Sequence, residues 1–313
     1  MTGPRPLTTL GGQPLGPAVF GAMQCGDGAD EAASHAMFEA SLEAGIRHFD
    51  TAHAYTGGAS EQLVGAFAAP RREQLFVATK VGLKGGAGRQ NLTSQFDVSR
   101  RRLGLDQVDL LYLHRFDPDT PLEETMEVFA EFHHKGWVRH FGLSNFAAWQ
   151  VMKAVGVAER LGLTVDVIQP MFSLVKRQAE VELLPMARSE GMTACTYSPL
   201  GGGLLTGKYV SHEGGRLTRD PKYSARYAPA WMFDAAAALS RIAQKVGVHP
   251  ATLAVAWVLH HPCRPVPIVS GKSTQQLQPS LEGLRHSLSP EMFRALSQLT
   301  PAPAPATDRL EEV

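Results

Sequence analysis

Eight short apolar runs recur at fairly even spacing along the chain, and they constrain the fold more than any other feature of the sequence. Each run is rich in β-branched or aromatic residues, which is typical of strands buried on both faces. Most runs are followed by a segment of helical periodicity, and this alternation predicts a parallel sheet with crossover helices. The predicted strands are Ala18–Met23, Ile46–Thr51, Leu75–Val81, Val108–His114, Val138–Ser144, Val165–Gln169, Met192–Tyr197 and Val266–Val269.

A parallel sheet of eight strands either closes into a barrel or stays open as a doubly wound sheet, and the glycine pattern helps to choose. An open sheet usually carries G-x-G-x-x-G after its first strand. Here the first strand runs into Gly21-Ala22-Met23-Gln24-Cys25-Gly26, which lacks that spacing. The length of 313 residues alone allows one or two domains. We expect an α/β fold, a (β/α)8 TIM barrel in a single domain over residues 1–313.

Local signals predict further elements at both ends of the barrel. Thr120-Pro121-Leu122-Glu123 predicts a helix start, with Thr120 as the cap and Glu123 completing a capping box. The residues before Pro17 are expected to form an N-terminal hairpin across the barrel bottom. The stretch from Gly201 to Pro229 is interpreted as a functional loop such as a lid. Extra C-terminal helices are expected near Asp234–Val246 and Pro290–Leu299, and residues 301–313 as a flexible tail.

Charge and cysteine content narrow the classes of function. The chain has 30 basic and 30 acidic side chains, so no nucleic-acid footprint and no membrane-surface charge is indicated. Three cysteines, Cys25, Cys195 and Cys263, lack the C-x-x-C spacing of zinc sites and fit a reducing compartment. The N-terminus lacks the apolar region of a signal peptide, and no uncharged apolar run reaches membrane-spanning length. We expect a cytoplasmic protein.

Four polar residues follow neighbouring strands at the positions where a barrel of this kind carries its chemistry. Asp50 ends the second predicted strand, Tyr55 lies in the loop after it, Lys80 ends the third and His114 ends the fourth. A tyrosine is a poor proton donor at neutral pH, but a neighbouring ammonium lowers its pKa. Lys80 is the candidate ammonium, Asp50 the acid that holds it, and His114 a donor to a carbonyl oxygen.

Each of these residues alone has an ordinary structural explanation. A strand-end Asp often caps the next helix, a Tyr in a glycine-rich loop often packs, and a Lys after a strand is commonly solvated. Four such residue types at four equivalent positions are much harder to explain by packing. The set therefore predicts a proton-donating catalytic unit.

Several motifs around these residues resemble the aldo-keto reductase family, from about Leu7 to Leu284. The resemblance implies a β/α barrel that binds NADPH/NADP+ without a Rossmann domain, with Asp50, Tyr55, Lys80 and His114 as the catalytic tetrad. It also implies hydride transfer to a carbonyl carbon, with Tyr55 as the proton donor and no metal. The motifs are FDTAHAYTGGASEQLVG, LFVATKVG, VDLLYLHRFDPDTPLEET, FGLSNF, VIQP and YSPLGGGLLTGKY.

The same resemblance assigns residues to the cofactor. Ser144, Asn145 and Gln169 match positions that bind the nicotinamide carboxamide, and Tyr197 matches the aromatic residue that stacks on the ring. The loop Ser198–Lys208 matches the one that wraps the pyrophosphate. The complete set is Gly21, Ala22, Met23, Asp50, Ser144, Asn145, Gln169, Tyr197, Ser198, Pro199, Leu200, Gly202, Leu204, Lys208, Ser270, Gly271, Lys272, Gln276 and Ser280.

Lys272 bears on the choice between NADPH and NADH. A cation there would pair with the 2′-phosphate of NADPH as a point charge, where the family usually has a bidentate arginine. The ordinary alternative is a solvated surface lysine. The sequence departs from the family pattern at Phe172-Ser173, in place of Tyr-Asn, and at Ser280, in place of Asn.

The histidine pairs and the substrate pocket are less constrained. His133-His134 and His260-His261 each end a helical segment, where a basic side chain suits the helix dipole, so no metal site is expected. His53 and Arg115 are substrate candidates beside Tyr55 and His114, and they suit a small polar carbonyl compound such as a sugar aldehyde. Met23, Phe172 and Trp231 are further candidates for the pocket lining.

Two other functions stay open alongside a reductase. One is a cofactor-binding, redox-sensing regulatory subunit, because the family fold also occurs in channel-associated β subunits. The other is a barrel that binds the cofactor without turnover, which the complete tetrad argues against. As partners we expect a small carbonyl substrate, no nucleic acid and no membrane, in a monomer or small homo-oligomer.

Overall fold

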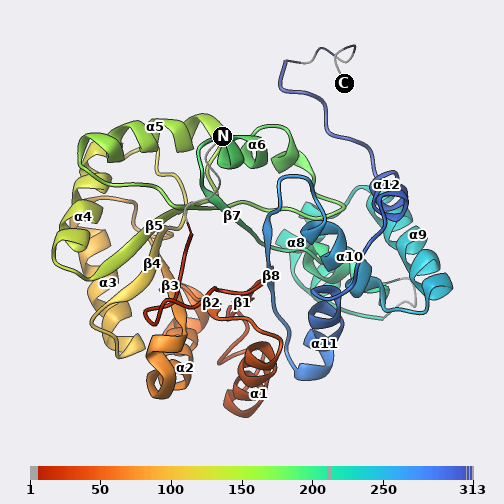
Figure 1. The fold of residues 1–313 in the computed structure, drawn as a ribbon, viewed down its shortest axis with the longest axis horizontal. Helices are drawn as coiled ribbons and strands as arrows, with labels where there is room; N and C mark the ends of the chain where they lie inside the picture. The colour runs from red at the N-terminus through yellow and green to blue at the C-terminus, as the bar shows by residue number, and fades with distance from the viewer. Residues whose placement is uncertain (1–5, 210–212, 308, 310, 312–313) are drawn as a thin grey trace.

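The computed structural model describes residues 6–209, 213–307, 309 and 311. In these residues eight parallel strands form a closed barrel in sequence order, with β8 pairing back to β1 (Figure 1). The predicted (β/α)8 barrel is confirmed, although several strands are shorter than the apolar runs. The strands are β1 Val19–Gly21, β2 His48–Asp50, β3 Phe76–Val81, β4 Val108–Leu113, β5 Val138–Ser144, β6 Val167–Gln169, β7 Thr193–Thr196 and β8 Val266–Val269.

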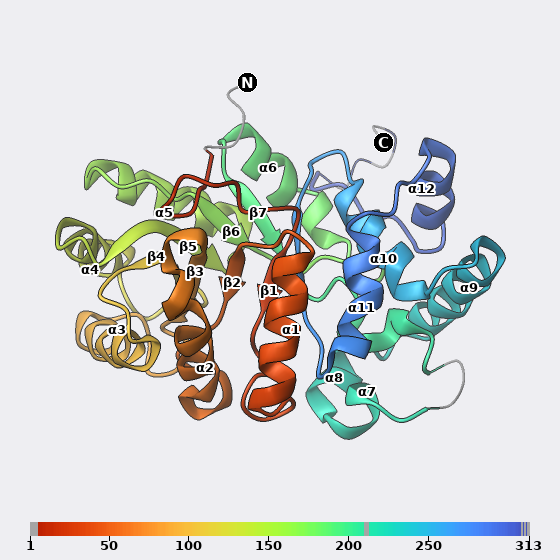
Figure 2. The same ribbon diagram turned by 60° about the horizontal axis from the view of Figure 1, so that its bottom comes forward.

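Helices pack around the outside of the barrel (Figures 1 and 2). Local chemistry sets several of their ends: the Asp30 side chain caps α1 by accepting from the Ala33 amide at 2.8 Å, and Gly247, with φ +78°, ends α9. The helices are α1 Glu31–Glu43, α2 Ala59–Ala68, α3 Arg89–Leu103, α4 Leu122–His134, α5 Ala148–Arg160, α6 Leu183–Ser189, α7 Arg216–Arg219, α8 Pro221–Arg226, α9 Ala230–Val246, α10 Pro250–Leu259, α11 Thr274–Gly283 and α12 Pro290–Ser297.

Two apolar layers follow from the alternation of side chains along each strand. Along β3, Phe76 and Ala78 belong to the cluster that fills the barrel, whereas Val77 and Val81 belong to the shell between strands and helices. Lys80 has the same parity as Phe76 and Ala78, so it enters the barrel from the carboxyl end of β3. The fold thus directs this charged side chain inward.

The N-terminal segment closes the opposite end of the barrel. Thr8 and Pro14 form an antiparallel bridge, and the Gly12 amide donates to the Thr9 carbonyl at 3.0 Å. Leu7 and Leu15 pack against the apolar cluster inside the barrel. The predicted hairpin is confirmed as one short turn, and Figure 2 shows it at the end of the barrel away from α7 and α8.

The start of α4 differs from the predicted capping box. Pro121 occupies the N-cap position and no side chain caps the helix there. The Thr120 hydroxyl instead donates to the Asp117 carboxylate at 2.7 Å. The predicted cap was wrong because the helix begins at Leu122, one residue later than expected, so Pro121 takes the N-cap position and Thr120 lies before it.

The segment between β7 and β8 is longer than a simple crossover. It contains the short helices α7 and α8, then α9 and α10, and so the predicted lid region is partly helical. The helices predicted near residues 234–246 and 290–299 are confirmed as α9 and α12. Within the described residues no single helix has the length and apolar character of a membrane span, and the one pair that passes jointly, α9 and α10, is bent by 99°.

The chain after α12 continues as an extended, mostly exposed segment over residues 301–307 (Figure 1). Its flexibility stays a prediction, and residues 308, 310, 312 and 313 lie outside the described part of the chain.

Candidate active site

The four residues of the predicted catalytic unit meet at the carboxyl ends of β2, β3 and β4. Asp50 is the last residue of β2, Lys80 is the fifth of six residues in β3, and His114 directly follows β4. Tyr55 begins a short helical turn in the loop after β2. Strand pairing at this end of the barrel brings four residues that are up to 64 positions apart in the sequence to one opening.

Lys80 is the centre of this group. Its side chain is fully buried, and its ammonium donates to the Asp50 carboxylate, to the Thr51 carbonyl at 2.8 Å and to the Tyr55 hydroxyl at 3.4 Å. An ammonium has three donors. All three are thereby directed at acceptors, one of which is the hydroxyl of the predicted proton donor.

The electrostatics of Tyr55 differ from the prediction. Burial acts to lower the pKa of Lys80, but Asp50 and Tyr55 outweigh it, so this pKa is raised and the ammonium is retained. Burial raises the pKa of Tyr55 and outweighs the lowering effect of Lys80. The expected net lowering of the Tyr55 pKa is therefore wrong, because the cost of desolvating a phenolate was left out. The phenol keeps its proton. Lys80 nevertheless makes the phenolate more stable than it would be in a buried tyrosine that has no ammonium beside it.

His114 is held as a neutral imidazole. Burial lowers its pKa to about 3, and the charges of Lys80 and Arg115 act in the same direction. Its ring lies edge-on to the Tyr55 ring, with the centroids 5.8 Å apart. Its Nδ1 atom is buried and has no hydrogen-bond partner among the described residues. A neutral imidazole has one N–H, so it can donate to an uncharged carbonyl oxygen without adding charge to the opening.

The residues predicted to hold the nicotinamide form one hydrogen-bonded chain that begins at Asp50. The Gln169 amide donates to Asp50 at 2.9 Å, and the Ser144 hydroxyl donates to the Gln169 carbonyl at 3.2 Å. The Asn145 amide donates to Ser144 at 3.0 Å, and the Tyr197 hydroxyl donates to Asn145 at 2.6 Å. The structure thus brings these four predicted residues together beside the tetrad, while their role toward a cofactor stays a prediction.

Asn145 and Ser198 have a backbone conformation that favours glycine. Their φ angles are +60° and +61°, and they follow β5 and β7 at the same end of the barrel. A left-handed conformation in residues other than glycine is uncommon and is found at functional sites more often than elsewhere. In Asn145 it accompanies donation from the side-chain amide to the His114 carbonyl at 2.9 Å, which ties the loops after β4 and β5 together.

Cationic side chains gather near the end of β8. Burial lowers the pKa of Lys208, and the neighbouring charges of Arg216, Lys272 and Arg219 lower it further, against the effect of Glu213. Lys272 is exposed and lies close to the loop after β1, where a methyl group on Gly28 would be 3.1 Å from its Cε. Four cations that repel one another suit a ligand with several phosphate charges.

The remaining cofactor candidates fall on the same rim. Gly21 ends β1, and the Ala22 amide donates to the Asp50 carbonyl at 2.8 Å, next to half-buried Met23. Pro199, Leu200, Gly202 and Leu204 lie in the turn after β7. Ser270 and Gly271 follow β8, and the side chain of Gln276 accepts from the Lys272 amide at 3.2 Å.

Two buried serine hydroxyls differ in what they can offer a nucleotide. The Ser270 hydroxyl is buried without a hydrogen-bond partner among the described residues, one residue after β8, on the rim beside the cations. Such an unpaired group suits a site that gains a ligand. The Ser280 hydroxyl is also unpaired within the described residues, but that side chain is fully buried in α11. The placement of Ser280 therefore does not support its predicted adenine contact.

Two of the predicted substrate residues point elsewhere. The His53 ring lies 3.3 Å from the Ser99 hydroxyl and 3.5 Å from the Arg102 guanidinium, both on α3 outside the barrel. Phe172 is fully buried and packs against Trp257, with ring centroids 5.1 Å apart. Both predictions relied on positions in loops after strands, and a neighbouring helix contacts each ring, so their roles toward a substrate stay predictions. Of the other three, Arg115 and Trp231 are exposed and Met23 is half-buried.

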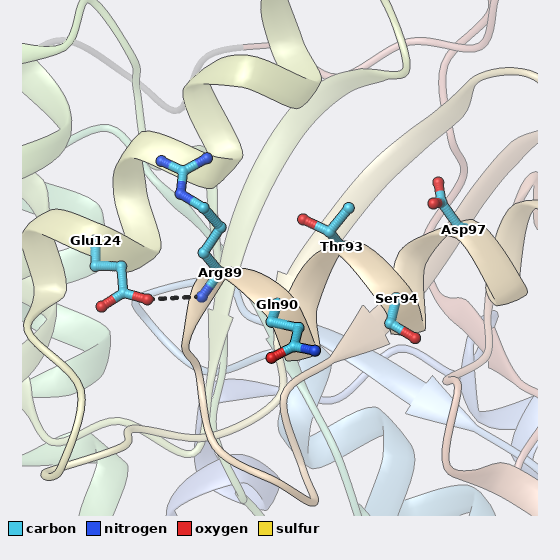
Figure 3. A pocket seen from close by; sticks show the side chains of 6 residues that line it. All are labelled: Arg89, Gln90, Thr93, Ser94, Asp97 and Glu124. Atoms are coloured by element: carbon cyan, nitrogen blue, oxygen red, sulfur yellow. Dashed lines mark hydrogen bonds between the residues drawn. The ribbon is translucent and has the colours of Figure 1, made fainter.

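Two surface grooves in the described residues lie away from the predicted site. The larger one, of about 750 Å³, lies between α3 and α4 on the outside of the barrel, and Figure 3 shows that α3 supplies most of its lining and Glu124 of α4 the rest. It contains none of the predicted site residues. At this groove the Glu124 carboxylate accepts from the Arg89 amide at 2.8 Å and so satisfies a free amide at the start of α3. No cluster of three or more His, Cys, Asp or Glu suitable for a metal occurs in the described residues.

Sequence reasoning missed several residues around the opening. The Thr51 carbonyl accepts from Lys80, and because every residue has a backbone carbonyl, the sequence cannot indicate this contact. Arg216 and Arg219 lie in the region interpreted as a lid, and its arginine content was the signal that could have marked them as neighbours of Lys208. Arg102 and Glu61, described below, lie on helices outside the barrel, where charged residues are ordinarily explained by solvent.

Comparison with known proteins places this chain in a family. The family model described as Aldo/keto reductase family matches residues 17–301. An uncharacterized oxidoreductase, YrpG of Bacillus subtilis, is 32% identical over 311 residues, covering 92% of this chain and 93% of the relative. Aflatoxin B1 aldehyde reductase member 2 of mouse is 38% identical over 216 residues, covering 67% of this chain and 59% of the relative. A probable voltage-gated potassium channel subunit beta of Arabidopsis thaliana is 30% identical, covering 85% of this chain and 86% of the relative.

The chain therefore belongs to the aldo/keto reductase family, as its motifs indicated. Membership makes it an oxidoreductase that acts on carbonyl compounds, in a family that generally uses nicotinamide cofactors.

Proposed function

We propose that this protein reduces a small aldehyde or ketone to the alcohol with NADPH, and that Tyr55 is the proton donor. The observation that carries the proposal is the contact of 3.4 Å between the Lys80 ammonium and the Tyr55 hydroxyl. A buried phenol next to a buried ammonium can release its proton to a carbonyl oxygen, because the ammonium stabilises the phenolate that is left.

Each residue of the tetrad has a separate task in this proposal. Asp50 keeps Lys80 charged and fixes its direction. Neutral His114 donates a hydrogen bond to the carbonyl oxygen and so favours the charge that develops there. A nicotinamide cofactor, when bound, supplies the hydride to the carbonyl carbon.

The preference for NADPH rests on the cations near β8. The charges of Arg216, Lys272 and Arg219 lower the pKa of Lys208, and Glu213 acts against them. A dinucleotide with an additional 2′-phosphate offers such a site more negative charge than NADH does. We assign the 2′-phosphate to Lys272 and the pyrophosphate to the loop that carries Lys208.

For the substrate we propose a small polar carbonyl compound, such as a sugar aldehyde. Arg115 directly follows His114 and is exposed at the same opening, so it can meet a hydroxyl or acid group of the substrate. An aldehyde substrate also agrees with the name of the mouse relative, an aflatoxin B1 aldehyde reductase. His53 and Phe172 are left out of this site, because both are engaged with other elements.

Replacing Tyr55 by Phe tests the proposal. The variant Tyr55→Phe removes the proton donor and leaves the ring, so reduction of an aldehyde panel should slow by about 10²- to 10⁴-fold. The dissociation constant for NADPH, measured by fluorescence titration, should change little. Near-full activity in Tyr55→Phe would contradict the assignment of the acid.

A redox-sensing regulatory subunit is a second candidate, and the likeness to the Arabidopsis channel subunit is the observation that favours it. The two functions differ in turnover. NADPH that protects the protein against heating, together with no oxidation of NADPH by any aldehyde of the panel, would favour the regulatory subunit.

A further inference from the structure

The loop that carries Tyr55 has an unusual backbone. Thr56, Gly57 and Gly58 follow Tyr55 directly, and their φ angles are +45°, +64° and +105°. Glycine adopts such angles readily, but Thr56 is β-branched and does so only where surrounding contacts hold it. The position of the Tyr55 hydroxyl thus depends on groups outside the loop.

Arg102, near the end of α3, makes contacts on both sides of Tyr55. Its guanidinium donates to the His53 carbonyl at 3.1 Å, two residues before Tyr55, and to the Gly57 carbonyl at 3.4 Å, two residues after it. The loop also passes very close to this side chain, since a methyl group on Gly58 would lie 2.4 Å from the Arg102 Cζ. Glycine at 58 is favoured by its φ, and any side chain there would displace the Arg102 guanidinium.

The same guanidinium is held by a buried acid. Arg102 Nη1 lies 3.2 Å from Glu61 Oε2, and the Glu61 side chain is fully buried. The other oxygen of Glu61 accepts from the Thr79 hydroxyl at 2.6 Å. Thr79 immediately precedes Lys80 in β3 and is itself fully buried.

These contacts connect the two residues whose separation matters for proton donation. From Arg102 one path leads to the loop of Tyr55, and another leads through Glu61 and Thr79 to the strand of Lys80. We propose that Arg102 and Glu61 are positioning residues that set the distance between Tyr55 and Lys80. The proposal rests on the proposed function, because the distance matters only if Tyr55 donates the proton.

The geometry calls for arginine in this position. A guanidinium has five N–H donors in a rigid plane, so it can serve two carbonyls and a carboxylate at once, whereas an ammonium acts as a point charge. A displacement of about 1 Å in a reacting group can slow an enzyme on the order of 10²-fold. Loss of the guanidinium should therefore slow proton donation while the cofactor residues on β5–β8 stay in place.

The variant Arg102→Met tests this, with Arg102→Lys as the conservative form. Arg177→Met is the matched control, because Arg177 also joins a glutamate to a backbone carbonyl. Its guanidinium lies 2.8 Å from the largely buried Glu180 carboxylate and donates to the Ser297 carbonyl at 2.9 Å. None of these partners is a predicted site residue. For each variant we would measure the folded fraction by circular dichroism, kcat, KM for NADPH, and the pH dependence of kcat.

We expect Arg102→Met to lower kcat by about 10- to 100-fold per folded molecule, with KM for NADPH nearly unchanged. Arg102→Lys should recover part of that loss. The alkaline limb of the kcat profile should move to higher pH in Arg102→Met, because Tyr55 loses part of the influence of Lys80. Arg177→Met should destabilise the fold and leave kcat per folded molecule and the pH profile unchanged.

Wild-type kcat and an unmoved alkaline limb in folded Arg102→Met would overturn the proposal, and so would an equal loss in Arg177→Met. If Arg102→Met fails to fold, Thr79→Val decides, because it removes one hydrogen bond to Glu61 and retains shape. It should lower kcat by about 2- to 10-fold, and an unchanged kcat would overturn the proposal. Activity retained in Tyr55→Phe would instead contradict the proposed function. Failure of the positioning role and failure of the proposed function are therefore distinguishable.

Discussion

The two ends of the barrel both contain a buried carboxylate paired with cations, and they use it differently. At the amino end, Asp109 accepts from the Val77 amide at 2.8 Å and pairs with Arg72 at 2.7 Å and Arg139 at 2.6 Å. At the carboxyl end, Asp50 pairs with the single cation Lys80 and accepts from Gln169 at 2.9 Å.

The difference lies in what remains available for a ligand. Both guanidiniums at the amino end are committed to Asp109 or to backbone carbonyls, such as that of Thr8 in the hairpin. At the carboxyl end Lys80 shares its charge with the Tyr55 hydroxyl, which has a proton to give. The ion pairs of Asp109 hold only groups of the fold in place, whereas the ion pair of Asp50 also contacts a hydroxyl that can give up a proton, so it can support a reaction.

The largest expected effects come from neutralising the two acids in turn. Asp50→Asn should lower kcat/KM by about 10²-fold or more, because Lys80 loses the group that holds and orients it. Asp109→Asn should lower the free energy of unfolding by about 3 kcal/mol, since two guanidiniums lose their partner, and leave kcat/KM per folded molecule unchanged. Steady-state kinetics and urea unfolding of both variants check this. A loss of activity in Asp109→Asn matching that in Asp50→Asn would erase the distinction between the two ends.

A smaller effect is expected at the cations near β8, which repel one another, unlike the paired arginines at the amino end. Lys272→Ala should raise KM for NADPH roughly tenfold, the equivalent of one charged hydrogen bond, and leave KM for NADH nearly unchanged. Lys272→Arg should keep or improve the affinity for NADPH, because arginine binds phosphate bidentately. Equal changes with the two cofactors in Lys272→Ala would show that Lys272 does not meet the 2′-phosphate.

The smallest effect concerns one buried histidine at each end. Burial, together with the charge of Lys80, lowers the pKa of His48 and of His114 to about 3. In the unfolded chain both titrate near 6.5, so between these values the unfolded state binds more protons and stability falls as the pH falls. Below about pH 6.5, each histidine should lower the free energy of unfolding by roughly 1 kcal/mol for each unit by which the pH falls.

Urea unfolding at pH 7 and at about pH 5 measures this contribution. His48→Gln and His114→Gln should each reduce the acid-induced loss of stability, and we expect only His114→Gln to slow reduction. An unchanged pH dependence in both variants would mean that folding does not lower the pKa of either imidazole.

The barrel and the position of the tetrad could be predicted from the sequence because both depend on short-range regularities. Strands buried on both faces appear as apolar runs, and a barrel collects the residues that end those runs on one rim. Asp50, Lys80 and His114 are each at or within one residue of a strand end. Once the sheet was expected to close into a barrel, these residues were therefore expected to lie together on one rim.

Other features depend on contacts between distant elements and could not be predicted. His53 was expected to face the substrate, but Ser99 and Arg102 on α3 attract its ring, and the sequence does not tell which helix packs behind that loop. The direction of the Tyr55 pKa depends on a balance of desolvation and charge that requires the burial of the site. Thr120 shows the same limit locally, because its hydroxyl donates to Asp117 and the helix begins one residue later than its capping pattern predicted.

The short N-terminal hairpin has a consequence for the order of events. Because side chains such as Phe76 and Tyr112 fill the barrel and Leu7 and Leu15 pack against them, the proposed carbonyl compound, alcohol and dinucleotide would all enter and leave at the rim that carries the tetrad. A molecule seated deeper cannot leave around one seated above it. Binding and release at one rim are then ordered, so the pattern of product inhibition reports which molecule occupies the outer position.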